Sequence, residues 1–156
     1  WVYYIDKDLD PKLVEYGKNA VKAFGMKERF FHIEFFKTKD DYIAIEYNNR
    51  PAGAFAVDVY NFAHSTDYFR VYAEVVNGTF NGLNVDEKYG LASTRRDYKD
   101  YVYSDEDIRN KYQDKLKAVL RMPEAFAELQ GNTMYVLVAD TLEEMKEMER
   151  FVGKLK

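Results

Sequence analysis

Four residues able to bind a metal ion and phosphate share one phase of an alternating stretch between positions 29 and 53. They are Glu34, Glu46, Asn48 and Arg50, all at even positions. The odd positions around them carry apolar side chains, namely Phe31, Ile33, Phe35, Ile43, Ile45 and Tyr47. Period-two alternation predicts two strands with one buried face and one polar face. The polar face would therefore carry the chemistry.

The spacing of the two acids indicates a shared cation. The run at 37–41 is polar and as short as a hairpin loop, and a turn centred near Asp40 would place Glu34 opposite Glu46. Like charges that face each other destabilise a sheet, so a compensating cation is expected between them. A hard divalent ion with carboxylate and amide oxygen ligands fits best. The alternative is that both acids merely lie on the solvated face, because a one-residue change in register would remove the pairing.

The composition is that of one globular domain. The chain has 156 residues, enough to bury one core of ordinary size. Apolar residues make up 47%, charged residues 32%, and the net charge of −4 provides no basic surface for nucleic acid. Cysteine is absent, which excludes disulfides and thiolate metal sites, and no apolar run reaches membrane-spanning length. These features favour a cytoplasmic protein without nucleic-acid or membrane partners.

Local signals predict helices on both sides of the hairpin. Before it, Asp10 followed by proline predicts the N-cap and first residue of a helix that ends at Gly25. After it, a short helix is predicted at 54–63, and another from Asp67 to Gly78.

The second half of the chain predicts three strands and two main helices. The strands are expected at 89–94, 98–103 and 134–139. A helix should open at the acidic run 104–107, carry Leu116 and Val119 on one stripe, and end near Pro123. Thr141 and Glu144 predict a capping box for the last helix. The solvated face of that helix would carry Glu143, Glu144, Glu147 and Glu149.

Three basic residues and one glycine are secondary candidates for the site. His32 shares the face of Glu34, where it either orients substrate or a metal-bound water, or is a hydrogen-bonded structural residue. Arg95 and Arg96 are adjacent in a strand and point to opposite faces, so at most one could reach a site, and surface solvation is favoured for both. Gly53 would let the backbone approach a phosphate closely.

The segment from 28 to 78 resembles the metal-binding signature of ATP-grasp enzymes. Its second strand ends in Glu46-x-Asn48-x-Arg50 and runs into Pro-Ala-Gly. The sequence Phe-His-Ile-Glu-Phe-Phe at 31–36 is similar to sequences of the carboxylate–amine ligase branch, of the large subunit of carbamoyl-phosphate synthase and of biotin carboxylase. The resemblance implies that Glu34, Glu46 and Asn48 hold magnesium or manganese ions that bridge the phosphates of ATP. It also implies a catalytic role for Arg50, and cofactor binding by Asn48, Arg50 and Gly53.

The fold implied by this resemblance is α+β, an antiparallel sheet with flanking helices. Residues 1–80 would form the carboxy-terminal portion of an ATP-grasp domain, with the metal and phosphate half-site. Residues 81–156 would form a small appended α/β segment packed on it as one compact unit. Nothing in the chain resembles the nucleotide-binding lobe that precedes this portion in ATP-grasp enzymes. That lobe of the same enzyme would be a missing partner, and the chain alone would be inactive.

Two functions from different classes are compatible with these features. The resemblance implies a parent enzyme that uses ATP and magnesium to activate a small-molecule carboxylate as an acyl phosphate, which an amine or ammonia then attacks, and such an enzyme could also be a homo-oligomer. The other hypothesis is a noncatalytic binding or oligomerisation module that keeps the fold. A lysine-bearing nucleotide lobe encoded upstream of Trp1 would favour the enzyme, and an unrelated domain would favour the module.

Overall fold

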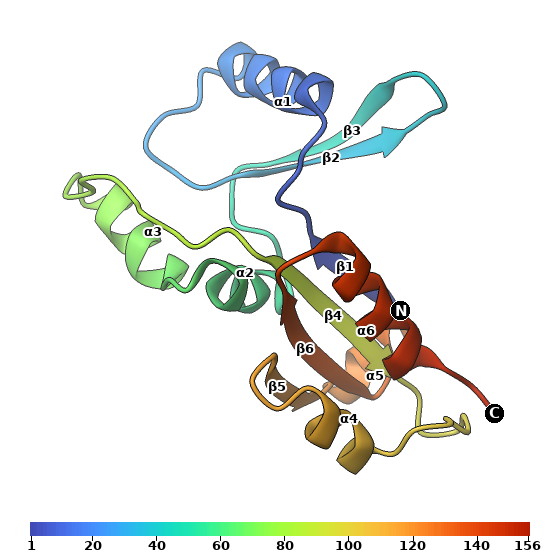
Figure 1. The fold of residues 1–156 in the computed structure, drawn as a ribbon. Coiled ribbons are helices and arrows are strands. Elements are labelled where there is room, and N and C mark those ends of the chain that lie inside the picture. The colour runs from blue at the N-terminus through green and yellow to red at the C-terminus, as the bar shows by residue number, and fades with distance from the viewer. The chain divides into compact units, whose positions relative to one another are not determined.

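A computed structural model describes residues 1–156 and has two compact units (Figure 1). Unit 1 comprises residues 1–7, 59–65 and 85–156, and unit 2 comprises residues 8–58 and 66–84. These units are not the continuous ranges 1–80 and 81–156 drawn from the sequence, because the first strand of the chain pairs with a strand of the second half. The predicted α+β class with antiparallel pairing is confirmed.

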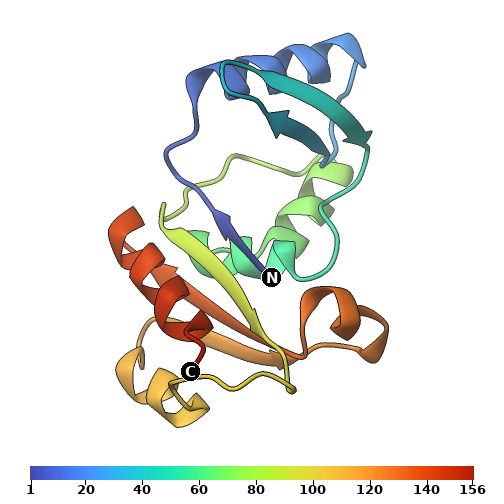
Figure 2. The ribbon, with the colours of Figure 1, turned by 90° about the vertical axis from the view of Figure 1, so that its right-hand side faces the viewer.

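Unit 1 is built on a four-stranded antiparallel sheet. Its strands, in spatial order, are β1 (Val2–Ile5), β4 (Tyr89–Arg95), β6 (Thr133–Ala139) and β5 (Leu116–Arg121). Helix α6 (Leu142–Gly153) crosses one face of this sheet, in front of it in Figures 1 and 2. Two shorter helices, α4 (Asp105–Lys111) and α5 (Glu124–Gln130), lie on either side of β5 along the chain.

The core of unit 1 lies between the sheet and α6. Alternate residues of β4 and β6 point toward the helix, which buries Met145, Met148 and Val152 against them. The other buried members of this cluster are Tyr89, Leu91, Ile108, Tyr112, Tyr135, Leu137 and Ala139. On the opposite face, Gly90 packs against the last turns of helix α2 (Ala56–His64), which begins in unit 2 and ends in unit 1.

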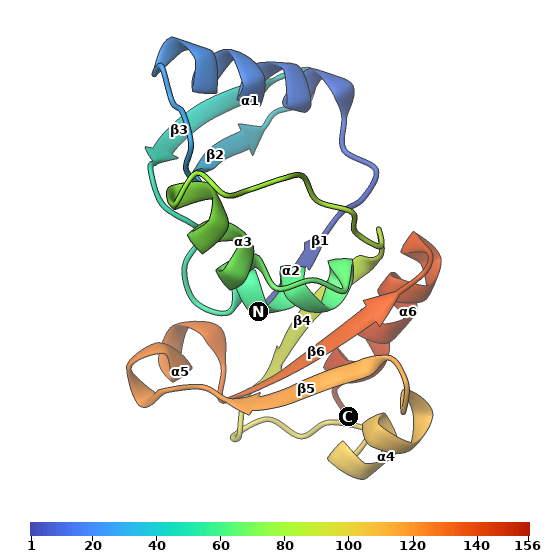
Figure 3. The ribbon, with the colours of Figure 1, turned by 90° about the vertical axis from the view of Figure 1, so that its left-hand side faces the viewer.

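Unit 2 contains a hairpin with a helix beside it. The hairpin is β2 (His32–Lys37) with β3 (Tyr42–Asn48), and helices α1 (Pro11–Ala23) and α3 (Tyr68–Val76) complete the unit (Figure 3). Polar contacts fasten α1 to the hairpin, since Lys12 pairs with Asp41 at 3.1 Å and the Tyr42 hydroxyl donates to Asp10 at 2.8 Å. That hydroxyl, with the backbone N–H of Lys12, holds the pKa of Asp10 below its ordinary value.

The predicted N-cap residues of α1, α3 and α6 are confirmed. Asp10 accepts a hydrogen bond from the backbone of Lys12 at 2.9 Å, and Asp67 accepts two from the first turn of α3. Thr141 accepts from the backbone of Glu144 at 3.2 Å, but the Glu144 carboxylate reaches Asp140 rather than Thr141, so the capping box is only half formed.

Three predictions of secondary structure are wrong. Helix α4 ends at Lys111, and residues 116–121, expected to continue the helix, form β5 because they pair with β6. The segment 98–103 is not a strand and forms only an isolated bridge between Tyr101 and Leu155. Strand β1 was not expected at all. None of the helices is both long and apolar enough to cross a membrane.

Candidate functional site

The hairpin brings the two predicted acids together. Glu34 on β2 lies directly opposite Glu46 on β3, and His32 lies opposite Asn48. A β-bulge produces this register, because the next pair toward the turn joins Phe35 to Ala44. Ile45 is therefore the extra residue of β3, between the acids and the hairpin loop.

The bulge also changes which side chains share a face. Phe36 pairs with Ile43, so Ile43 lies on the acid-bearing face and not on the apolar face that strict alternation predicted. Ile43 and Ile45 are 55% and 48% exposed, whereas Phe35 and Tyr47 are half-buried. The prediction of one buried odd face is therefore wrong for the part of β3 that precedes Glu46.

His32 connects the acids to the segment after β3. Its Nδ1 lies 3.2 Å from the backbone oxygen of Arg50, and its Nε2 lies 3.8 Å from Oε1 of Glu34. The His32 side chain is 20% exposed and that of Glu34 is 51% exposed, so the ring is the better-packed partner. The imidazole thus bridges one strand of the hairpin and the Arg50 backbone.

Asn48 and Arg50 end the row of polar residues. Asn48 is half-buried, and its Nδ2 is enclosed without a hydrogen-bond acceptor. A buried amide group of this kind ordinarily has a partner, and a phosphate oxygen could supply the missing acceptor. The Arg50 guanidinium donates through Nη1 to the backbone oxygen of Pro51 at 3.1 Å, which leaves further N–H groups for an anion.

The loop after Arg50 is tight, although Gly53 does not need a glycine-only conformation. A Cβ at Gly53 would lie 3.8 Å from Nη1 of Arg50, which is ordinary contact. The left-handed conformation falls on the next residue, Ala54, with a φ of 52°. The structure therefore shows no steric or conformational requirement for glycine at position 53.

The donor set fits a hard divalent ion such as magnesium. Two facing carboxylates and a neighbouring carboxamide are oxygen ligands of the kind that magnesium prefers, and water completes its coordination in many proteins. No cluster of three or more His, Cys, Asp or Glu side chains in the structure could hold a metal ion. The Asn48 amide would therefore be needed as the third protein ligand.

The paired arginines at 95 and 96 serve the structure of unit 1. Arg95 is buried, and its guanidinium donates to the backbone oxygens of Val152 and Tyr103, both at 2.8 Å. Arg96 donates to the backbone oxygens of Glu128 and Leu129 at the end of α5. The expectation of surface solvation is wrong for Arg95, because contacts from distant parts of the chain bury it.

The chain has an ATP-grasp-type fold, as comparison with solved structures shows. No family model matches the chain, and no curated protein matches it.

Three similar structures are named as a ligase, a synthetase and the ATPase subunit of a carboxylase. An L-amino acid ligase from Bacillus licheniformis superposes with a TM-score of 0.69 at 16% identity, over 96% of this chain and 43% of that one. The phosphoribosylglycinamide synthetase from Anaerococcus prevotii gives 0.66 at 13% identity, over 99% and 44%. The phosphoribosylaminoimidazole carboxylase ATPase subunit from Aquifex aeolicus gives 0.61 at 16% identity, over 99% and 46%. The chain thus spans less than half the length of each.

Proposed function

We propose that the chain is the metal- and phosphate-binding part of an ATP-dependent ligase. The observation that carries this proposal is the direct pairing of Glu34 with Glu46 at the end of a hairpin in an ATP-grasp-type fold. Two ionised carboxylates side by side lose stability through repulsion unless a cation lies between them. A ligand-binding role explains why both acids are present.

Each residue of the hairpin has a separate role in this proposal. Glu34, Glu46 and Asn48 supply oxygen ligands to magnesium, which when bound offsets the repulsion between ATP and a carboxylate substrate. Arg50 donates to the transferring phosphoryl group, and its planar fork suits two oxygens at once. Gly53 leaves room for a phosphate beside the backbone. His32 holds the Arg50 backbone in place through the 3.2 Å contact with its carbonyl oxygen.

The proposed reaction has two steps. A carboxylate oxygen of a small-molecule substrate bonds to the γ-phosphorus of ATP as the bond to ADP breaks, giving an acyl phosphate and ADP. The nitrogen of an amine or of ammonia then bonds to the acyl carbon, inorganic phosphate leaves, and the nitrogen loses a proton. The adenine and the remaining phosphate contacts would come from a second, nucleotide-binding lobe of the same enzyme. These 156 residues alone would not turn over substrate.

A hydroxylamine trap on the full-length protein tests this proposal. Hydroxylamine replaces the amine substrate and converts any acyl phosphate into a coloured hydroxamate, so a panel of carboxylic acids can be screened with ATP and magnesium. We expect hydroxamate and ADP in equal amounts with at least one acid, and none without magnesium. ADP release without hydroxamate would contradict the acyl phosphate step.

The exposure of the acids favours one alternative. Glu34 and Glu46 are both exposed, and no third acidic, cysteine or histidine ligand completes a cluster with them. In a noncatalytic binding or oligomerisation module, the same hairpin would be a solvated surface that keeps the fold. A full-length protein that neither binds ATP nor releases ADP with any acid of the panel would support the module.

A further inference from the structure

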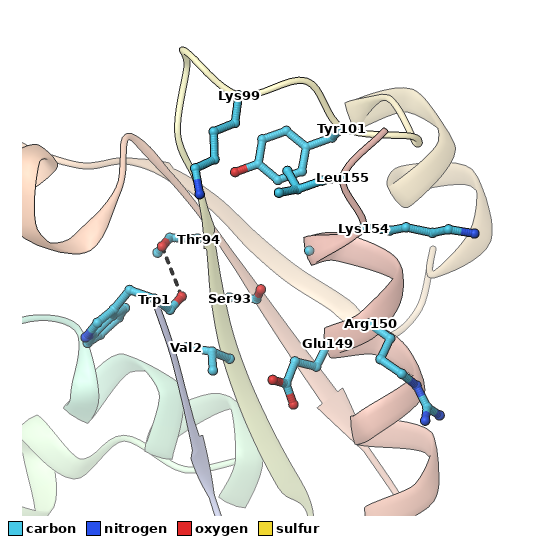
Figure 4. A pocket seen from close by; sticks show the side chains of 11 residues that line it. Trp1, Val2, Ser93, Thr94, Lys99, Tyr101, Glu149, Arg150, Lys154 and Leu155 are labelled. Atoms are coloured by element: carbon cyan, nitrogen blue, oxygen red, sulfur yellow. Dashed lines mark hydrogen bonds between the residues drawn. The ribbon is translucent and has the colours of Figure 1, made fainter.

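Unit 1 has a cavity of about 730 Å³ at the edge of its sheet (Figure 4). The cavity lies between the edge strand β1, the neighbouring strand β4 and the last turn of α6, and the segment after β4 closes its upper end in the figure. It exists because α6 packs on β4 and β6, while β1 extends the same face beyond the helix. Cavities of this size are typical of small-molecule sites.

Two opposite charges in this cavity have no protein counterion. Lys99 and Glu149 take part in none of the ion pairs of the structure. By contrast, Glu144 and Glu147 on the same helix pair with Lys115 and Lys111. Glu149 is only half exposed, so its charge lacks both full hydration and a partner.

The directions of the side chains separate these charges from the other cations nearby. Figure 4 shows the Glu149 carboxylate directed toward β1, whereas Arg150 and Lys154 point away from that strand. The Lys99 ammonium reaches down toward Thr94 at the other end of the cavity. The Lys99 ammonium therefore lies at one end of the cavity and the Glu149 carboxylate lies nearer β1.

Neutral groups complete the lining. The Tyr101 hydroxyl accepts a hydrogen bond from the Arg96 backbone at 2.9 Å, so its own proton can be donated into the cavity beside Lys99. Ser93 is buried on the floor, and Val2 and Leu155 add apolar wall. Donors at one end, an acceptor nearer β1 and apolar wall match a molecule with both kinds of charge.

We propose that this cavity binds a small zwitterion, a molecule with one carboxylate and one ammonium group. Its carboxylate would lie against Lys99 and Tyr101, and its ammonium group against Glu149. This site lies wholly within unit 1 and does not depend on the function proposed for the hairpin.

Matched dipeptides test the proposal on the chain itself. Glycyl-L-leucine carries both charges, its N-acetyl derivative only the carboxylate, and its C-terminal amide only the ammonium group. Titration followed by amide NMR should shift the signals of Ser93 and Leu155, with a dissociation constant on the order of 1 mM for glycyl-L-leucine. Each one-charge derivative should bind about tenfold more weakly.

Variants identify the residues responsible. Glu149→Gln should weaken the binding of glycyl-L-leucine about tenfold and leave the binding of the N-acetyl derivative unchanged. Lys99→Met should likewise weaken the binding of glycyl-L-leucine and leave the binding of the C-terminal amide unchanged. The controls are Glu143→Gln and Lys146→Met, which remove exposed charges of α6 outside the cavity lining and should change nothing. No shift at Ser93 and Leu155 with glycyl-L-leucine up to about 20 mM, or equal binding of all three compounds, would overturn the proposal.

Discussion

Replacing Glu46 by Gln should change the stability of the chain in opposite directions with and without magnesium. The substitution keeps the size of the side chain and removes one of the two facing charges. Opposed like charges on neighbouring strands destabilise a sheet by roughly 0.2–1 kcal/mol. Because the Glu34 side chain is 51% exposed, water screens the pair and a gain of about 0.5 kcal/mol is expected without metal.

Magnesium should reverse this order. At a free concentration about tenfold above its dissociation constant, an ion that binds only the folded chain stabilises it by about 1.4 kcal/mol. For a chain of this size, each kcal/mol moves the melting temperature by roughly 2–4 °C. The natural chain should therefore gain about 3–6 °C from magnesium, and the Glu46→Gln variant much less.

Differential scanning calorimetry in magnesium chloride, against sodium chloride of equal ionic strength, measures both effects. Glu143→Gln removes an exposed acid from α6 and serves as the control that keeps the full response to magnesium. An equal response of the natural chain and the Glu46→Gln variant would refute a shared ion. A Glu46→Gln variant that is less stable without metal would refute the repulsion between the two acids.

Three further predictions concern packing, pH and turnover. Gly90→Ala should destabilise the chain by about 1–3 kcal/mol in urea unfolding, because the new Cβ would lie 2.9 Å from a side-chain atom of α2. At Gly17, by contrast, a new Cβ would meet nothing within 4 Å, so Gly17→Ala should stabilise α1 by roughly 0.5–1 kcal/mol. Backbone and side-chain hydrogen bonds from Ser104 hold the pKa of Asp107 below 3.8, so the carboxylate stabilises α4 above that pH and ceases to do so as the pH falls through its lowered pKa. The stability difference between the natural chain and Asp107→Asn should accordingly close in acid, as thermal melts at pH 7 and pH 3 would show. If the full-length protein has the proposed ligase activity, Glu46→Gln should lower its kcat at least ~10²-fold, measured as hydroxamate formation. Arg50→Lys should also lower kcat in this assay, because an ammonium group cannot replace the bidentate guanidinium.

Features set by neighbouring residues could be predicted from the sequence. Asp10 and Asp67 cap their helices by accepting hydrogen bonds from backbone N–H groups two or three residues away. Both partners of each bond are therefore visible in a short stretch of sequence. The pairing of Glu34 with Glu46 was also predicted, although the bulge at Ile45 was not. The register at the loop, if continued, would pair Glu34 with Ile45, so the predicted pair forms only because of the bulge. The bulge depends on how the rest of the hairpin packs.

Features set by distant residues could not be predicted in this way. Residues 116–121 have leucine, lysine and alanine, which favour helix, and they become a strand only because β6 offers them an open edge. The acids of α6 look alike in sequence, yet two of them have lysine partners, Glu149 lines a cavity and Glu143 is exposed. The partners of those acids lie up to 36 positions away, so the pattern of one helix does not reveal them.

The bulge at Ile45 also bears on self-association through the edges of the hairpin. Strands β2 and β3 form a sheet of two, so each has an unpaired edge, and Phe36 and Ile43 near the loop are 63% and 55% exposed. A flat, apolar edge of this kind is a template on which another copy can add strands and begin an aggregate. A bulge increases the local twist and interrupts the regular row of backbone donors and acceptors. We therefore expect the extra residue between the acids and the loop to make the edge of β3 a poorer template for another copy.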